Sequence, residues 1–190
     1  MRSNLILAAL SVAFGAGSSS AAPILALDFD PLLPGVQSTA TVRPGESLVV
    51  EIRIAEVEAT APLNAFELDL VFDPSVATSV SAAIGPFLVL PMTEIENVLG
   101  PDEIGLAAVT IGPGAAFGGG LLGVVVFEGV AVGAAALSLD NVVLSSPFGV
   151  PIEGATLQGG TLHVVPEPTT TLLLGLGVAL LAVSTRRAAR

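Results

Sequence analysis

Asn64 to Phe72 read N-A-F-E-L-D-L-V-F and carry the clearest structural signal in this 190-residue chain. From position 66 to 72, large apolar residues alternate with Glu67, Asp69 and a valine, the period-two pattern of a strand with one buried face. Asp73-Pro74 follows and favours a turn. We therefore expect a strand whose apolar side chains enter a core and whose two acids point to solvent.

The same alternation recurs upstream and weaker β-like runs follow downstream. Ser47 to Ala55 read S-L-V-V-E-I-R-I-A. Turn clusters rich in Gly and Pro separate the runs, among them Gly118 to Gly120, and only the two termini favour helix. This spacing predicts an all-β antiparallel sandwich or jelly roll of eight or nine strands. The remaining expected strands are 24–29, 39–42, 76–84, 104–111, 121–132, 135–144 and 161–165.

Two segments resemble the opening of cohesin domains. Val42 to Val50, V-R-P-G-E-S-L-V-V, match a Pro-Gly turn that leads into a strand. Leu63 to Val76, L-N-A-F-E-L-D-L-V-F-D-P-S-V, match a strand that ends in an aromatic-Asp-Pro turn. The resemblance implies a nine-stranded cohesin-like sandwich over residues 22-165, related in fold to some carbohydrate-binding modules. Cohesins themselves hold dockerin-bearing enzymes on a scaffold, but a dockerin-type partner does not carry over to this chain, because the recognition face varies in that family and no motif here identifies it.

The end of the chain has the composition of a membrane segment. Pro166-Glu167-Pro168 precede an uncharged stretch at 169-185, and Arg186, Arg187 and Arg190 come last. Seventeen helical residues span about 26 Å, enough for a thin hydrocarbon core. Because arginine resists translocation, the cluster should stop transfer and stay in the cytoplasm, leaving the preceding domain outside.

Residues 166-190 as a whole are similar to the PEP-CTERM sorting signal of Gram-negative bacteria that make exopolysaccharide. The resemblance implies recognition by a membrane exosortase and cutting near Pro166, Glu167 and Pro168, so that the membrane helix would be a transient anchor. The two prolines would keep this segment extended and accessible. The alternative interpretation is a permanent anchor with a Pro-rich stalk.

The N-terminus has the three regions of a secretory signal peptide. Arg2 is followed by an apolar stretch from Leu5 to Phe14 and then by small residues. We expect signal peptidase to cut between Ala21 and Ala22, which makes residues 1-21 the signal peptide. The apolar stretch is too short to span a membrane.

The exported segment is strongly acidic. All 17 acidic residues lie between positions 22 and 168, opposed there only by Arg43 and Arg53, which gives a formal charge of −15. Such a surface repels nucleic acid and anionic lipid. The chain contains no cysteine, so the domain must be stabilised by its core rather than by disulfides.

The sequence offers little for catalysis. His163 is the only histidine, and no G-x-S-x-G motif is present. Glu67 and Asp69 could in principle serve a glycosidase, but they are better explained as the polar face of a strand. Tyr and Trp, which usually stack on sugars, are absent. We predict that the protein is not an enzyme.

Calcium is the cofactor to consider, because hard oxygen donors suit it in an anionic exported domain. Asp28, Asp30 and Asp73 are the candidate ligands, with the loop acids Asp102 and Glu103 beside them. No EF-hand loop is present. The alternative interpretation is that these acids occupy ordinary turns at strand ends.

Together these features predict a non-catalytic exported protein. It would be sorted by an exosortase to the cell surface or extracellular matrix and associate with exopolysaccharide or biofilm. One alternative is a cohesin-like binding module for a dockerin-type protein or a polysaccharide. A second alternative, less favoured, is a glycan-active hydrolase.

Overall fold

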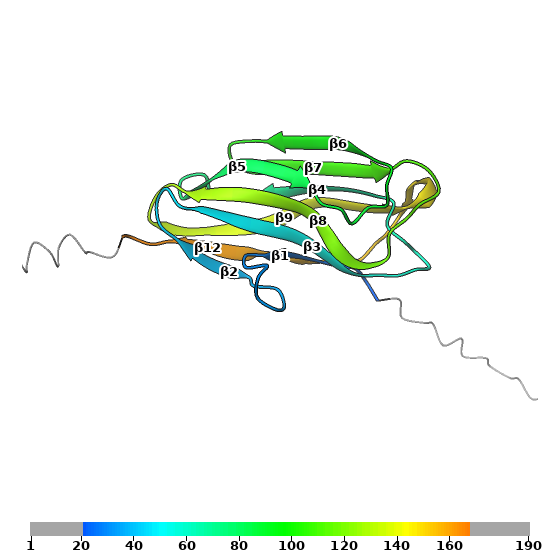
Figure 1. The fold of residues 1–190 in the computed structure, drawn as a ribbon, viewed down its shortest axis with the longest axis horizontal. Coiled ribbons are helices and arrows are strands. Elements are labelled where there is room, and N and C mark those ends of the chain that lie inside the picture. Colours follow the sequence, from blue (N-terminus) through cyan, green and yellow to red (C-terminus); the bar gives the residue numbers. More distant parts are fainter. Residues whose placement is uncertain (1–20, 168–190) are drawn as a thin grey trace, which may run out of the picture.

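Two β-sheets pack face to face in the computed structural model, which describes residues 21–167 (Figure 1). No α-helix occurs among these residues, and a short 3-10 turn at Pro147–Gly149 is the one helical element. The strands are β1 (Ile24–Asp28), β2 (Thr39–Val42), β3 (Ser47–Val57), β4 (Ala65–Val71), β5 (Ala77–Ile84), β6 (Met92–Leu99), β7 (Glu103–Thr110), β8 (Gly118–Gly129), β9 (Gly133–Ser146), β10 (Val150–Pro151), β11 (Thr156–Gln158) and β12 (Gly160–Val164).

The strand order places sequence-distant segments side by side. One sheet has the order β11-β1-β3-β8-β5, and the other has the order β2-β12-β9-β4-β7-β6 with β10 added to β9. The all-β sandwich is confirmed. The expected count of eight or nine strands is wrong, since the described residues form twelve. The sheets are also not wholly antiparallel, because β11 lies parallel to β1, and β2 lies parallel to β12.

The core is built from the alternating residues that the sequence predicted. Ile52 of β3 and Leu68 and Leu70 of β4 are fully buried between the sheets. Phe72 meets Phe127 of β8 edge to face, with ring centroids 5.1 Å apart. Burial of each such side chain stabilises the fold by roughly 1.5–3 kcal/mol. A continuous apolar core thus spans both sheets of a domain that has no disulfide.

Strand β6 was missed and one predicted turn is wrong, each for an identifiable reason. β6 shows no alternation, because a bulge at Ile95 interrupts its pairing with β7 and it lies at a sheet edge. Gly118 to Gly120 open strand β8 instead of forming a turn. At Gly120 a side chain would overlap the ring of Phe87, so glycine here permits close approach within a strand.

Several predicted features lie outside the described residues. These are the signal peptide up to position 20, Pro168, the membrane helix at 169-185, and the arginines Arg186, Arg187 and Arg190. Between residues 21 and 167, none of the helical structure is long and apolar enough to cross a membrane.

Candidate functional site

The outer face of β9, β4, β7 and β6 collects side chains from four strands. Glu67 of β4 pairs with Val143 of β9 on one side and with Ala107 of β7 on the other. Ala107 in turn pairs with Glu96 of β6. Since paired residues share a face, and the neighbouring Phe66 is buried, these four side chains form one outward-facing row.

A second row lies directly beside the first. Asp69 of β4 pairs with Gly105 of β7 and with Asp140 of β9. A Cβ at Gly105 would lie 2.5 Å from Oε1 of Glu96 and 3.5 Å from Oδ1 of Asp69, so these two carboxylate oxygens lie within about 6 Å of each other. Because Gly105 has no side chain, both carboxylates can extend across its position.

One polar contact holds Asp69 in place. The side-chain amide Nδ2 of Asn141 donates a hydrogen bond of 2.7 Å to Oδ2 of Asp69. Asn141 adopts a left-handed backbone conformation, with φ at 47°, where β9 has an irregular register with β4. Asparagine tolerates this conformation better than most residues. The bulge thus directs an amide toward the carboxylate.

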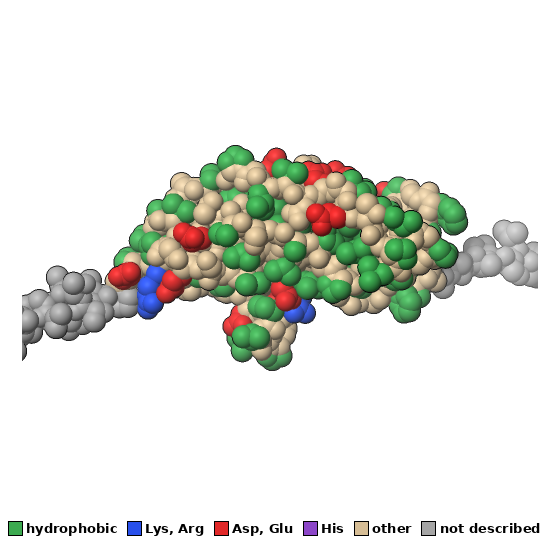
Figure 2. Space-filling view, turned by 45° about the horizontal axis from the view of Figure 1, so that its top comes forward, with side chains coloured by type: hydrophobic (Ala, Val, Ile, Leu, Met, Phe, Trp, Pro, Cys, Tyr) green, Lys and Arg blue, Asp and Glu red, His purple; other side chains and the backbone are tan. Residues whose placement is uncertain are grey.

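We call this surface the acidic face and define it by five carboxylates and the apolar side chains among them. Ile95 is 66% exposed and Val143 is 55% exposed. They line a hollow of about 310 Å³ together with Glu67, Glu96 and small residues. Acidic side chains also gather along the upper edge in Figure 2, the side on which Figure 1 places β6. The five carboxylates belong to Glu67, Asp69, Glu96, Glu103 and Asp140.

Neither arginine of the described residues 21–167 neutralises the acidic face. Arg43 lies in the turn between β2 and β3, where it pairs with Glu46 at 3.0 Å. Arg53 lies on β3 of the other sheet. Ionised carboxylates accept hydrogen bonds and do not donate them, so the face is suited to bind Lys or Arg side chains around an apolar residue.

Sequence reasoning identified part of this face. The prediction that Glu67 and Asp69 lie on the polar side of their strand is confirmed, because the strand residues that alternate with them are buried. Glu96, Asp140 and Asn141 were missed. The bulges in β6 and β9 remove the alternation that would have marked these residues as outward-facing.

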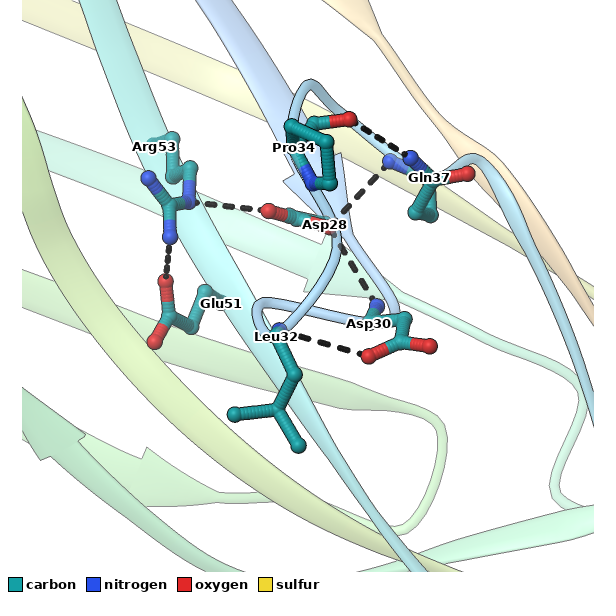
Figure 3. A network of polar contacts seen from close by, with 7 residues as sticks. All are labelled: Asp28, Asp30, Leu32, Pro34, Gln37, Glu51 and Arg53. Carbon is teal, nitrogen blue, oxygen red and sulfur yellow. Dashed lines mark hydrogen bonds and ion pairs between the residues drawn. The ribbon is translucent and has the colours of Figure 1, made fainter.

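A second polar cluster surrounds Asp28, at the end of β1 (Figure 3). The Asp28 side chain is buried, and its Oδ2 lies 3.0 Å from Nε of Arg53 in an ion pair. Oδ1 accepts hydrogen bonds from the backbone amides of Asp30 and Gln37, at 3.2 and 3.1 Å. Arg53 also pairs with Glu51 at 2.6 Å. This cluster closes the loop 29–38, which projects below the sandwich (Figures 1 and 2).

The calcium candidates are not gathered into one site. Both oxygens of Asp28 already face cationic or amide donors, and Oδ1 of Asp30 accepts from the amide of Leu32 at 3.3 Å. Asp73 lies after β4 and is bonded to Ser75. Within residues 21–167, no group of three or more acids or histidines is arranged to hold a metal ion.

Asp73 gives the domain a pH-dependent contribution to stability. The hydroxyl and then the amide of Ser75 donate to Oδ1 of Asp73, at 2.6 and 2.9 Å, and lower the pKa of the carboxyl below its ordinary value. Because the pKa is lower in the folded state, this stabilisation is complete above an unfolded pKa of about 3.9 and is lost as the pH falls through the folded pKa. We expect Asp73→Asn to remove that part of the acid sensitivity, measured as melting temperature between neutral pH and about pH 2.5. A constant difference between wild type and variant across this range would contradict the assignment.

The predicted processing positions and the histidine lie at the surface. Pro166 and Glu167 are exposed and follow the last strand. Ala21 is exposed at the start of the described chain, and its amide donates to Oε1 of Glu58 at 2.8 Å. Ala22 follows it directly. His163 is exposed on β12, paired with Thr41 of β2 and Ala134 of β9.

Comparison with known proteins supports both resemblances. Residues 164–188 match the model of the PEP-CTERM protein-sorting motif. No curated protein matches this chain. The chain therefore carries a PEP-CTERM sorting signal at its C-terminal end.

Solved cohesin structures match the described fold. The seventh ScaB type I cohesin of Pseudobacteroides cellulosolvens is 17% identical with a TM-score of 0.62, covering 78% of this chain and 96% of that one. A non-cellulosomal cohesin from Archaeoglobus fulgidus is 17% identical with a TM-score of 0.59, covering 76% and 92%. The sixth cohesin of scaffoldin B from Acetivibrio cellulolyticus, solved with a Cel5 dockerin, is 14% identical with a TM-score of 0.59, covering 76% and 100%. At these identities the likeness establishes the fold.

Proposed function

We propose that this chain, a PEP-CTERM protein with a cohesin-like domain, is an exported, non-catalytic surface or matrix protein that binds a partner protein through its acidic face. The sorting motif implies export and sorting to the cell envelope. The observation that carries the binding proposal is the row of carboxylates around exposed Ile95 and Val143 on one uncovered sheet face.

The chemistry of the face specifies the partner. Carboxylates that lean together over Gly105 repel one another, and a Lys or Arg from a partner would relieve this repulsion. The hollow beside Val143 would accept an apolar side chain at the centre of the contact. Since a related fold was solved in complex with a dockerin, we propose a dockerin-type protein with basic residues around an apolar anchor.

Binding can be measured directly with the full-length chain. Dockerin domains encoded by the producing organism would be purified singly and titrated against the chain at low and at physiological salt. Because opposite charges steer this association, we expect affinity to fall as salt rises. Failure of every dockerin domain to bind, or binding that does not respond to salt, would contradict the proposal.

The same geometry supports the proposal that the protein is not an enzyme. Glu67 and Asp69 lie on a sheet face rather than in a deep cleft, and His163 is on the neighbouring strand pair at the sheet edge. We propose that association with exopolysaccharide or biofilm results from retention of the sorted domain at the cell surface. An acidic domain fits this role because its charge keeps it soluble.

Sorting would proceed from an accessible junction. β12 ends at Val164, and exposed Pro166 and Glu167 follow it, so an exosortase could reach them without unfolding the sheet. In the proposed topology the helix at 169-185 holds the chain in the membrane, and Arg186, Arg187 and Arg190 stay in the cytoplasm. Signal peptidase would already have cut between Ala21 and Ala22.

Intact mass of the protein recovered from its cells tests this processing. We expect a released species that starts at Ala22 and ends close to Pro168. Replacement of Pro166, Glu167 and Pro168 by alanine should leave a membrane-bound species that ends at Arg190, because the recognition motif is gone. The matched control replaces Glu153, an acid in another loop, by alanine and should be processed normally. A wild-type chain that stays intact in the membrane would instead establish a permanent anchor.

A further inference from the structure

The two ends of the sandwich differ in charge. At one end Val164 of β12 pairs with Gly133 of β9, and the neighbouring turns meet there through backbone contacts such as Gly45 to Gly129 and Phe72 to Asp102. Five acids lie in or beside the turns and the chain exit at this end, although the turn at 130–132 is itself uncharged. These acids are Glu46, Asp73, Asp102, Glu128 and Glu167.

The opposite end is largely uncharged. There the loops 85–91, 111–117 and 146–151 contain no charged residue. The first two loops lie together, since the amide of Ile111 donates to the carbonyl of Pro91 at 2.7 Å. The segment 63–64 connects them to the third loop, because Leu63 bridges to Ala116 and the amide of Asn64 donates to the carbonyl of Ser145 at 2.8 Å. Two acids at this end, Glu58 and Glu153, line a hollow together with Ala21, where the described chain begins.

Exposed apolar side chains concentrate at this uncharged end. Phe148 is fully exposed in the turn after β9, Leu90 is 75% exposed and Phe117 is 65% exposed. Hydrophobic side chains are visible at this end on the right of Figure 2. We define the apolar tip by five residues, Leu90, Ile111, Phe117, Phe148 and Val150.

The backbone presents Phe148 at a conformational cost. Its φ is 69°, a left-handed conformation that a bulky residue rarely adopts. Within a single chain, no burial of the Phe148 ring compensates for this strain. At the same end of the sandwich, a hollow of about 460 Å³ is lined by Phe87, Val89 and Phe117 among others. The apolar tip therefore contains both a projecting aromatic ring and an apolar hollow.

We propose that the apolar tip is a self-association surface whose occupant is the tip of a second copy of this chain. The charge distribution favours contact between two copies through their uncharged ends. Two copies with a formal charge of −15 each repel one another wherever their carboxylates meet. β9 has 14 residues and runs from the charged end to the tip, a length of roughly 45 Å.

Pairing through the tips places the two charged ends far apart. Their separation would be several times the Debye length of about 8 Å at physiological salt, so their repulsion is screened. A two-fold pair is self-complementary, with Phe148 of each copy entering the hollow beside Phe117 of the other. Because the chain leaves the domain at the charged end, such a pair joins two domains that point in opposite directions.

Single-cysteine cross-linking of the full-length chain in detergent tests this pairing, because the natural chain has no cysteine. Val150→Cys places a thiol at the tip, and Ala131→Cys places one at the charged end. With a short bismaleimide we expect dimers from Val150→Cys at least about tenfold more abundant than from Ala131→Cys. Equal yields at the two positions, or no dimer from Val150→Cys, would overturn the proposal.

Removal of the aromatic side chains provides the second measurement. In the Val150→Cys background, Phe117→Ser with Phe148→Ser should reduce dimer yield roughly tenfold, since aromatic anchors dominate interfaces. The matched control is Val130→Ser with Val132→Ser, which removes two exposed apolar side chains at the charged end. An equal loss of dimer in the control would overturn the proposal. So would a chain that forms no dimer but binds phosphatidylcholine vesicles, if the substitutions at the apolar tip abolish that binding. Lysine substitutions on the acidic face should leave the dimer intact, so this proposal can fail independently of dockerin binding.

Discussion

Charge reversal of Asp69 and Glu96 to lysine is expected to weaken the binding of a dockerin-type partner by about a hundredfold or more. In the wild type the two carboxylates lean over Gly105 and create a concentrated negative potential. Two lysines would place positive charge opposite the basic residues of the partner, and such like-charge contacts cost several kcal/mol. A hundredfold change corresponds to about 2.8 kcal/mol. Isothermal titration of the full-length chain would measure it.

A matched control separates the effect of charge on the acidic face from the effect of net charge on affinity. Glu56→Lys with Glu128→Lys changes the formal charge by the same amount, but both residues lie on the other sheet, on β3 and β8. We expect the control to alter affinity by less than about fivefold, mainly through the rate of association. Similar losses in both double variants would show that net charge, and not this face, governs binding.

Asp28→Ala is expected to lower the free energy of unfolding by about 3 kcal/mol. The substitution removes the acceptor for the amides of Asp30 and Gln37 and leaves the guanidinium of Arg53 without its buried partner. Breaking a buried pair from one side typically costs about 3–5 kcal/mol. The Arg53 side chain is 42% exposed and keeps Glu51, so the loss should lie at the lower end of that range.

Urea unfolding followed by far-ultraviolet circular dichroism would measure this loss. The exposed pair Arg43–Glu46 has the same separation of 3.0 Å, so Glu46→Ala is the matched control. We expect that control to cost less than about 1 kcal/mol, because solvent screens the pair. If Asp28→Ala cost no more than the control, the buried cluster would not be what holds the loop 29–38.

Strand content could be predicted where one strand face is buried and the other is not. The centres of β3 and β4 were predicted correctly from sequence because buried and more exposed residues alternate from Val50 to Ile54 and from Phe66 to Leu70. β10 and β11 were missed, since they have only two and three residues and are exposed throughout. Such short edge strands form because a neighbouring strand offers unpaired backbone groups, which no local pattern records.

The candidate surfaces show the same division. Glu67 and Asp69 could be assigned to an outward face from their spacing alone. Their meeting with Glu96 and Asp140 required the register of β6, β7 and β9, which depends on two bulges. Likewise, Asp28 was read as a possible calcium ligand, whereas pairing of β1 with β3 brings Arg53 beside it.

Local chain chemistry was therefore sufficient for the sandwich class, the absence of disulfides, the acidic charge and the sorting signal, because each is a property of composition or of consecutive residues. The three-dimensional arrangement was needed to place carboxylates from four strands on one face, to bury Asp28 against Arg53, and to collect Leu90, Phe117 and Phe148 at the end opposite the sorting signal. These contacts join residues far apart in sequence, and the register and order of the strands alone determine which of them meet.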